Sequence, residues 1–480
     1  MKLSYLLRNT VTKSDYKDVE ISYITDDSRK CKDGCAFVCI EGKNFDGHTA
    51  AKKAEESGAV VIIAQKDVGC SNQVLVENTR SEYAKMCSLF YSEPSKKMKL
   101  IGVTGTNGKT TVSTLIYNVL SALGRKAGLI GTVSNIINGK KTDSVLTTPD
   151  AFDLNRMFKE MADCETEYCI MEVSSQALDQ CRTDGCHFDI AVFTNLTQDH
   201  LDYHGSMENY IAAKRKLFLN SDSAVVNIDD SSYKSLIEGT ECKVMTYSAK
   251  QNAADLTAKT IKLSSGGVDY AIVGISMIGR VHYETPGMFS VYNSMAVIGC
   301  LLELGFDFDS VLEAVSKLKS VKGRFEVLDT DTSYKVIVDY AHTPDGLENV
   351  IKTLNEVKQG RVITVFGCGG DRDKTKRPIM GKTVAELSDI AVVTTDNPRT
   401  EEPESIINDI LEGMKGSKNQ TYVKVDRTQA IEFALSIAKE NDIILLAGKG
   451  HETYQIIGKE KIHYDEREKV AEYLQRQKEN

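Results

Sequence analysis

The sequence has no tryptophan, only seven prolines in 480 residues, and no pair of cysteines spaced as Cys-x-x-Cys. Its twelve cysteines therefore lack the spacing typical of zinc sites, and Cys169, Cys300 and Cys368 lie in apolar segments. A free thiol in such a segment behaves as a small buried hydrophobe. We expect reduced, structural thiols rather than disulfides or a zinc centre.

Long apolar runs and an excess of positive charge are missing as well. No segment approaches the roughly 18–20 apolar residues that cross a bilayer, and residues 1–8 do not resemble a signal peptide. The formal net charge of -9 argues against a nucleic-acid-binding surface over the whole molecule, although it allows a local basic pocket for a small anion. We expect a cytoplasmic protein that binds neither nucleic acid nor membrane.

The chain is long enough for two to four domains. Apolar residues make up 41% and charged residues 26%, as in globular proteins. The polar stretch Glu93–Lys97 is a plausible linker, and a new alternation of strands and helices begins near Val327. We therefore predict three domains, at residues 1–97, 98–326 and 327–480.

Apolar strands alternate with helical patterns through most of the chain, which predicts α/β domains with mainly parallel sheets covered on both faces. The expected strands are Ala36–Ile40, Val60–Ala64, Val74–Val76, Leu100–Thr104, Tyr168–Val173, Ile190–Asn195, Ala224–Ile228, Val336–Asp339, Val362–Phe366, Ile390–Thr394 and Ile443–Ala447. The expected helices include His48–Ser57, Ser81–Tyr91, Leu347–Val357, Ser405–Met414 and Thr428–Ala438. Residues 242–283 indicate a β-rich insertion or sheet edge.

A glycine-rich loop joins the strand at Leu100–Thr104 to a helix that runs to about Leu123. It reads Gly105-Thr106-Asn107-Gly108-Lys109-Thr110-Thr111. Backbone N–H groups and the helix N-terminus attract phosphate, Lys109 can reach the β- and γ-phosphates, and the Thr110 hydroxyl can reach Mg²⁺. The usual first glycine is replaced by Val103, but the strand–loop–helix context still predicts a P-loop ATPase-like central domain.

Two further clusters follow strands. Glu172 ends the strand at 168–173, where open α/β sheets bind ligands, although a lone glutamate there is as often an ordinary exposed residue. The stretch 194–204 crowds Asp199, His200, Asp202 and His204 into six positions. Oxygen ligands with an occasional imidazole suit Mg²⁺ beside phosphate. We predict a magnesium site built from these loops.

A series of motifs, in this order, resembles the Mur ligases over essentially the whole chain. The motifs are residues 104–111, 171–175 and 195–205, Ala213-Lys214, Val291-Tyr292-Asn293, Gly323-Arg324-Phe325-Glu326 and residues 339–344. The resemblance is greatest to the ligases that add the third residue of the peptidoglycan stem peptide. It implies a small N-terminal α/β domain, a central ATP-binding domain and a C-terminal Rossmann-like domain.

The resemblance also assigns substrates to residues. The substrates would be ATP, with Mg²⁺ as cofactor, an amino acid and UDP-N-acetylmuramoyl-L-alanyl-D-glutamate. The implied UDP-substrate contacts are Ser28, Lys43, Asn44, Phe45, Thr147, Thr148, Ser174, Gln180 and Arg182. Thr110, Glu172 and His200 match the metal positions; Lys109, Glu172, His200 and Lys214 match the catalytic ones; and Asn293, Arg324, Asp339 and His342 would complete the ATP site.

Lys214 matches a lysine that the family carries as a carbamate. From the residues alone, Lys214 is one of three consecutive basic residues on a helix, so a solvated face is the alternative. Carbamylation needs a neutral amine and hence a lowered pKa. The implied chemistry is phosphorylation of the D-glutamate side chain by ATP to an acyl phosphate, followed by attack of an amine. The base for that amine is not assigned.

The C-terminal segment indicates which amino acid is added. Asp396-Asn397-Pro398-Arg399 follows an apolar strand and resembles the signature of ligases that add meso-diaminopimelate, and the Arg is the position that differs in lysine-adding relatives. A guanidinium suits the second carboxylate of diaminopimelate, which lysine lacks. Arg372, Gly448 and Glu452 match further contacts.

Three alternatives stay open. They are a lysine-adding ligase of the same family, a folylpolyglutamate synthase-type ligase with the same ATP loop, and a nucleotide-dependent switch without synthetic activity. The last would need an Asn-Lys-x-Asp motif after a later strand, which the sequence lacks. Besides the small-molecule substrates, UDP-N-acetylmuramoyl dipeptide and meso-diaminopimelate, we expect neither nucleic acid nor membrane as a partner, and we expect a monomer.

Overall fold

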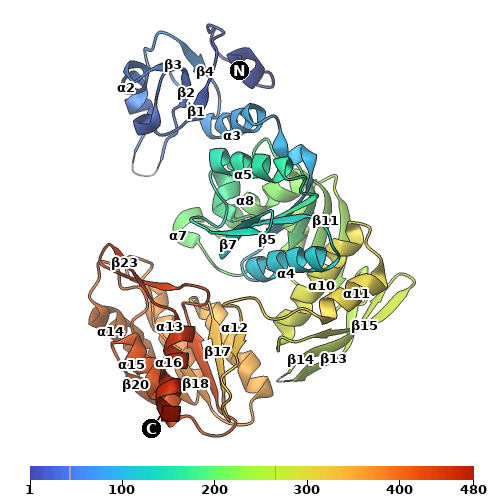
Figure 1. The fold of residues 1–480 in the computed structure, drawn as a ribbon, viewed down its shortest axis with the longest axis vertical. Coiled ribbons are helices and arrows are strands. Elements are labelled where there is room, and N and C mark those ends of the chain that lie inside the picture. Colours follow the sequence, from blue (N-terminus) through green and yellow to red (C-terminus); the bar gives the residue numbers. More distant parts are fainter. Residues whose placement is uncertain (43–44, 265, 480) are drawn as a thin grey trace. The chain divides into compact units, whose positions relative to one another are not determined.

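The computed structural model describes residues 1–42, 45–264 and 266–479 (Figure 1). The chain divides into two compact units. The first unit comprises residues 1–247 and 299–305, and the second comprises residues 248–298 and 306–480. Lys43 and Asn44, two of the predicted nucleotide-sugar contacts, lie outside the described residues. All twelve cysteines are free thiols.

The first unit begins with a small parallel sheet of strand order β1-β2-β3-β4. Its elements are α1 Leu3–Leu6, β1 Tyr23–Thr25, η1 Ser28–Lys30, β2 Cys35–Val38, η2 Gly47–Ala50, α2 Ala51–Glu56, β3 Ala59–Ala64, β4 Gln73–Leu75 and α3 Thr79–Phe90. Apolar side chains alternate along β2 and β3, so that one face packs on α1 and α3 and the other on α2. The helix expected at 48–57 begins as a 3₁₀ turn.

The segment expected to be a linker is a short 3₁₀ helix, η3 Pro94–Lys97, after Glu93 in the left-handed region at φ 50°. Proline is well suited to this first helical position because its fixed φ is already helical and its missing N–H has no acceptor there. Pro94 and Ser95 are buried. This segment leads directly into β5 Lys99–Thr104, the strand before the glycine loop.

The central sheet has the strand order β12-β11-β10-β5-β9-β6-β7-β8, parallel from β12 to β6 and antiparallel at its β7–β8 edge. The strands are β6 Ala127–Ile130, β7 Ser134–Ile137, β8 Lys140–Asp143, β9 Tyr168–Glu172, β10 Phe188–Phe193, β11 Ser221–Asn227 and β12 Lys243–Ser248. The helices that accompany them are α4 Lys109–Ala122, α5 Ala151–Asp163, α6 Ser175–Asp179, α7 Leu201–His204, α8 Met207–Leu219 and α9 Tyr233–Ile237. Parallel strands place the loops after β5, β9 and β10 at one edge.

The second unit contains an antiparallel meander and a six-strand sheet. The meander is β13 Leu256–Ser264, β14 Gly267–Gly274 and β15 Met277–Tyr283, which confirms the β-rich character expected for this stretch. The helices α10 Met288–Glu303 and α11 Phe308–Ser316 follow it. Described helices that are both long and apolar enough to span a membrane are absent.

The C-terminal sheet has the order β16-β17-β21-β18-β19-β20, with only the β16–β17 pair antiparallel. Its elements are β16 Glu326–Leu328, β17 Lys335–Asp339, α12 Pro344–Val357, β18 Val362–Phe366, α13 Lys376–Leu387, β19 Ile390–Val393, α14 Pro403–Met414, β20 Gln420–Val423, α15 Arg427–Ile437, β21 Ile443–Ala447, β22 Tyr454–Ile457, β23 Glu460–His463 and α16 Glu466–Glu479. Helices α12, α13 and α14 cover one face and α15 and α16 the other (Figure 1). The predicted α/β fold class is confirmed.

Candidate active site

The glycine loop has a backbone that only glycine accommodates at one position. Gly105 has φ 150°, and a Cβ there would lie 1.9 Å from Thr194 Oγ1. Gly108, at φ 87°, precedes the first turn of α4. The ammonium of Lys109 folds back and donates to the carbonyls of Gly105 and Thr106 at 2.9 and 2.8 Å. The loop therefore has the strand–loop–helix geometry that the sequence predicted.

The carboxylate of Glu172 lies at the centre of a buried hydrogen-bond cluster. Its side chain is 1% exposed. The Thr110 hydroxyl donates to Oε2 at 2.9 Å, and Thr132 donates its backbone N–H to Oε1 at 2.7 Å and its hydroxyl to Oε2 at 2.9 Å. This burial excludes the alternative of an ordinary exposed glutamate. The parallel pairing of β5 and β9 brings this strand end beside the glycine loop.

Lys214 is not on a solvated face. Its side chain is 1% exposed, and Nζ donates to the carbonyl of Gly105 at 2.8 Å and to Thr104 Oγ1 at 3.3 Å. Burial, together with the nearby charge of Lys109, holds its pKa well below the ordinary value. The neutral amine that carbamylation needs is therefore favoured in this position. The Gly105 carbonyl accepts from both lysines.

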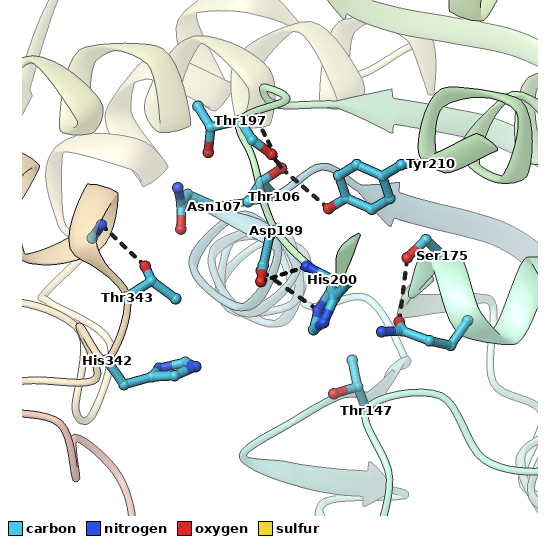
Figure 2. A network of polar contacts seen from close by, with 12 residues as sticks. Thr106, Asn107, Thr147, Ser175, Thr197, Asp199, His200, Tyr210, His342 and Thr343 are labelled. Atoms are coloured by element: carbon cyan, nitrogen blue, oxygen red, sulfur yellow. Dashed lines mark hydrogen bonds and ion pairs between the residues drawn. The ribbon is translucent and has the colours of Figure 1, made fainter. Parts of the chain in front are cut away.

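The segment after β10 places a hydroxyl network against the glycine loop (Figure 2). Thr106 Oγ1 and the Tyr210 hydroxyl lie 3.1 Å apart, and Thr106 exchanges hydrogen bonds with the backbone of Thr197 at 3.0 and 3.1 Å. His200 is left-handed at φ 53°, and its Nε2 lies 3.5 Å from Asp199. Its ring is about half exposed.

No three His, Cys, Asp or Glu side chains in the described part of the chain converge as ready metal ligands. The Thr110 hydroxyl and Glu172 carboxylate nevertheless form an oxygen pair beside the phosphate loop. Mg²⁺ usually takes only one or two carboxylate ligands from the protein and completes its shell with water and phosphate oxygens. The residues present fit such an ion.

Another predicted set gathers at the carboxyl end of β9. The Thr148 hydroxyl donates to the Glu172 carbonyl at 2.8 Å, and the Ser174 N–H donates to that hydroxyl at 3.0 Å. Arg182 donates to the Thr148 carbonyl at 2.8 Å, and its Nε and Nη2 both donate to Gln180 Oε1. Thr147 and Thr132 share a hydroxyl contact of 3.1 Å. Burial lowers the pKa of Arg182.

Ser28 and Phe45, two further predicted UDP-substrate residues, lie in connections of the small N-terminal sheet. Ser28 begins η1, which Asp27 caps through the N–H of Arg29. Phe45 is 60% exposed, unusually so for a large apolar side chain. A cavity of about 670 Å³ in this part of the chain is lined by Glu41, Gly42, Gln65, Glu77, Asn78 and Arg80.

Four residues predicted for the ATP site belong to the second unit. Asn293 is buried on α10. Asp339 ends β17, and its carboxylate accepts the N–H groups of Phe325 at 2.6 Å and Ala341 at 2.7 Å. Burial raises the pKa of Asp339 despite the nearby Arg324. Each of these residues stays a prediction for ATP binding.

Arg324 and His342 flank the aromatic ring of Tyr340. The Arg324 guanidinium lies 4.6 Å from the centre of the ring, and the His342 ring packs on it at 4.6 Å. His342 Nδ1 donates to the Tyr340 carbonyl at 2.8 Å, which fixes the proton on that nitrogen. His451 packs against the same ring, and burial lowers its pKa to about 3.

The loop after β19 holds Arg399 in a constrained backbone. Arg399 has φ 51°, its N–H donates to the Ile456 carbonyl at 3.1 Å, and its guanidinium donates to the Gly370 carbonyl at 2.8 Å. A Cβ at Gly370 would lie 1.9 Å from the Pro398 carbonyl oxygen. The loop at 369–373 and the loop at 396–399 therefore touch backbone to backbone.

The same loop carries an amide and a carboxylate into the interior. Asn397 is 5% exposed and donates through Nδ2 to Glu452 Oε2 at 2.9 Å. Asp396 is 6% exposed and lies 3.3 Å from the ammonium of Lys449. Burial favours a higher pKa for Asp396, but Lys449 and Arg427 oppose it and the net shift is downward. Burial and Asp396 together raise the pKa of Glu452.

Arg372 and Gly448 complete the predicted acceptor residues. The Arg372 side chain is exposed and donates to the Asp371 carbonyl at 3.1 Å. A Cβ at Gly369 would lie 3.0 Å from Arg399 Nη1 and 3.8 Å from Arg372 Cγ, so the two arginines flank one glycine. Gly448, at φ 112°, would bring a Cβ to 3.0 Å from Asp396 Oδ2. The structure thus brings the predicted acceptor residues together.

Three residues of these clusters were missed by sequence reasoning. Thr132 follows the short strand β6, which the sequence did not predict, and its position one residue after a glycine at a strand end was the available signal. Tyr210 lies on α8 among ordinary helical residues. Lys449 stands between two glycines, a context that often marks a functional loop.

Comparison with known proteins agrees with this geometry. Three family models match the chain: Mur ligase family, catalytic domain, at residues 20–98; Mur ligase middle domain, at 103–301; and Mur ligase, glutamate ligase domain, at 323–450. The chain belongs to the Mur ligase family. Members of this family are ATP-dependent, ADP-forming carbon–nitrogen ligases.

Individual relatives match over nearly the full length. The UDP-N-acetylmuramoyl-L-alanyl-D-glutamate--2,6-diaminopimelate ligases of Clostridium botulinum and Clostridioides difficile are each 45% identical, over 99% and 95% of this chain and 99% and 96% of their own. A solved structure with the same enzyme name superposes with a TM-score of 0.71 at 32% identity, covering 98% of this chain and 99% of its own. A Mycobacterium tuberculosis folylpolyglutamate synthase, at 18% identity and a TM-score of 0.63, covers 77% of this chain and 92% of its own and shares the fold.

Proposed function

We propose that this protein joins meso-2,6-diaminopimelate to the D-glutamate of UDP-N-acetylmuramoyl-L-alanyl-D-glutamate, using ATP and Mg²⁺. The names of its full-length relatives support this reaction. The observation that carries the choice of amino acid is Arg399, anchored by the Gly370 carbonyl in a loop whose backbone allows little movement. A guanidinium held this way pairs with a carboxylate, which diaminopimelate has at its far end and lysine lacks.

Phosphoryl transfer comes first in the proposed reaction. The γ-phosphoryl group of ATP passes to the D-glutamate side-chain carboxylate, which gives an acyl phosphate and ADP. The loop at 105–111 supplies N–H donors, and Lys109 supplies a positive charge, for the oxygens on which charge develops. Thr110, Glu172 and His200 are the residues proposed to hold Mg²⁺, which would neutralise phosphate charge when bound.

Lys214 is proposed to be the carbamylated lysine. Its burial and its lowered pKa support a neutral amine able to react with carbon dioxide. The modification would turn a buried neutral amine into an anion near Lys109, whose ammonium already shares the Gly105 carbonyl with Lys214. This would create an attraction to the Lys109 ammonium and supply a negative group to the magnesium site.

The muramoyl dipeptide is proposed to bind at the carboxyl end of β9. Ser174, Gln180 and Arg182 are proposed to bind it, because Arg182 is the one cation of that cluster and the substrate is anionic. The Thr148 hydroxyl donates to the Glu172 carbonyl, and the Thr147 hydroxyl contacts that of Thr132, which in turn donates to the Glu172 carboxylate. Such a connection would place the carboxylate to be activated next to the phosphate loop.

The amine step uses the C-terminal residues. Arg399 and Arg372 are proposed to bind carboxylates of diaminopimelate, and Asp396, Asn397, Gly448 and Glu452 to bind the amino group at its far end. The other amino group, as the free amine, attacks the acyl carbon, the amide forms, and inorganic phosphate leaves. Selection against lysine would arise because an arginine left without its anion costs on the order of 1–3 kcal/mol.

Phosphate release is the test of this function. It should require ATP, Mg²⁺, the muramoyl dipeptide and diaminopimelate together, with amide product detected by mass spectrometry. Turnover with lysine equal to that with diaminopimelate would overturn the choice of amino acid. Phosphate release from ATP without either co-substrate would indicate a nucleotide switch instead.

A further inference from the structure

Lys449 lies in the interior of the acceptor loop cluster, where its ammonium has no solvent exposure. It donates to Asn397 Oδ1 at 3.1 Å and to the Tyr454 carbonyl at 2.9 Å. Its Nζ also lies 3.3 Å from Asp396 Oδ1 and 3.6 Å from Glu452 Oε2. One buried cation therefore reaches the carboxylates of Asp396 and Glu452 and the Asn397 amide, which itself donates to Glu452.

Lys449 fixes which way the Asn397 amide faces. Asn397 Oδ1 accepts from Lys449 Nζ and from the Ile456 N–H at 3.0 Å, so both of its lone pairs have donors. The Nδ2 group must then face the other way, and it donates to Glu452 Oε2 at 2.9 Å. If the amide flipped, two donors would oppose an N–H₂ group in a buried site, which is costly.

The charges around Lys449 do not cancel. Arg427 is paired with Glu466, its Nη2 lying 2.7 Å from Oε1, and both side chains are buried. That leaves Asp396 and Glu452 as two carboxylates facing one ammonium, with side-chain exposures of 8% and 11%. A buried unpaired charge is expensive, so the cluster is suited to a ligand that brings one further cation.

We propose that Lys449 is a positioning and specificity residue for the amino group at the far end of the acceptor amino acid. It neutralises one of the two carboxylates, keeps the Asn397 amide in a single orientation, and thereby leaves one carboxylate to pair with a single ligand ammonium. Lys449 itself does not touch the ligand. This inference rests on the proposed function, because it takes diaminopimelate as the acceptor.

The test compares two acceptors that differ in one group. L-2-Aminopimelate keeps the far carboxylate of diaminopimelate but has hydrogen where the far amino group stands. In the wild-type enzyme we expect kcat/KM for diaminopimelate to exceed that for L-2-aminopimelate by at least about tenfold, since a charged hydrogen-bonded group is lost. In Lys449→Met we expect this ratio to fall towards one, with KM for ATP within about twofold of wild type.

Matched variants separate positioning from general damage. Lys459→Met removes an exposed lysine from the β22–β23 turn and should keep the wild-type ratio. Lys449→Gln keeps an N–H donor for Asn397 and serves if the Met variant is insoluble; its ratio should also fall. A wild-type ratio in Lys449 variants that have lost overall rate would overturn the inference. A wild-type enzyme that shows no turnover with diaminopimelate would instead refute the proposed function.

Discussion

The Thr110 hydroxyl donates to Glu172 Oε2 at 2.9 Å across a sequence separation of 62 residues. Thr110 lies in the first turn of α4 after the glycine loop and Glu172 ends β9, and the pairing of β5 with β9 brings them together. The contact unites the two motifs for which the sequence predicted metal binding. It also defines where charge-neutralising substitutions should be most harmful.

Glu172→Gln should abolish magnesium-dependent turnover while leaving the fold intact. The amide keeps an acceptor for Thr110 but loses the negative charge that an Mg²⁺ ion requires. We expect kcat to fall by at least about a hundredfold. Activity measured across a magnesium titration checks this, with Glu167→Gln as the control because that partly exposed glutamate lies just before the opposite end of the same strand. Unchanged magnesium dependence in Glu172→Gln would exclude it as a ligand.

Gly105→Ala should impair ATP binding. A Cβ there would meet Thr194 Oγ1 at 1.9 Å and Asn195 O at 3.0 Å, so the phosphate loop must shift. We expect KM for ATP to rise by about tenfold or more. Gly139→Ala is the matched control, because its φ of 74° is also left-handed but no atom lies within 4 Å. That control should lose about 1 kcal/mol of stability and no ATP affinity.

Lys214→Met should remove a carbamate signal as well as activity. In ¹³C-bicarbonate, the wild-type enzyme should show a carbamate resonance that the variant lacks. Lys216→Met, on the same helix but exposed, should retain both the resonance and the activity. A wild-type spectrum without the resonance, in a fully active enzyme, would count against the modification.

Arg399→Ala should lower kcat/KM for diaminopimelate by roughly ten- to hundredfold, the cost of one charged contact. KM for ATP should not change, because the guanidinium is bound within the C-terminal loops. Steady-state kinetics with each substrate varied in turn distinguishes the two effects. Arg476→Ala on α16 controls for loss of an exposed arginine. A variant whose main defect is in ATP affinity would contradict the assignment.

Glu401→Gln should destabilise the protein at neutral pH and much less in acid. The buried Arg377 guanidinium donates to Glu401 at 2.8 and 3.0 Å and lowers the pKa of that carboxyl to about 2. The stabilisation is therefore complete above the ordinary pKa of about 4.5 and is lost as pH falls towards 2. Denaturant unfolding should give a difference of about 1–3 kcal/mol at pH 7 that shrinks below pH 4.5. A pH-independent difference would contradict the linkage.

Much of this architecture could be predicted from the apolar runs in the sequence. The strands β5, β9, β18 and β21 lie within one residue of their expected bounds, because buried parallel strands are short continuous apolar runs. The strands β6 to β8 were missed. The strands β6 and β7 are only four residues long, and β8 reads Lys-Lys-Thr-Asp and is exposed throughout. Polar edge strands carry no apolar signal, so only pairing with a neighbour reveals them.

The sequence predicted the site residues that belong to local motifs and missed those that act over long sequence distances. Glu172 and Lys214 belong to recognisable local patterns, whereas Thr132 and Lys449 act through hydrogen bonds to residues 40 and 52 positions away. Burial of Lys214 likewise depends on how α8 packs on the sheet, which one helix sequence does not specify. The roles of these residues stay predictions until the variants are measured.

The backbone contact between Gly370 and Pro398 bears on how this enzyme could acquire a different acceptor. Because a single methyl group at Gly370 would lie 1.9 Å from the Pro398 carbonyl oxygen, neither loop can be lengthened or exchanged without displacing the other. Directed evolution towards a new amine should therefore succeed through side-chain replacements at Arg399 and Arg372 on an unchanged backbone. Loop-swap chimaeras with other ligases should fail unless both segments are transferred as one block.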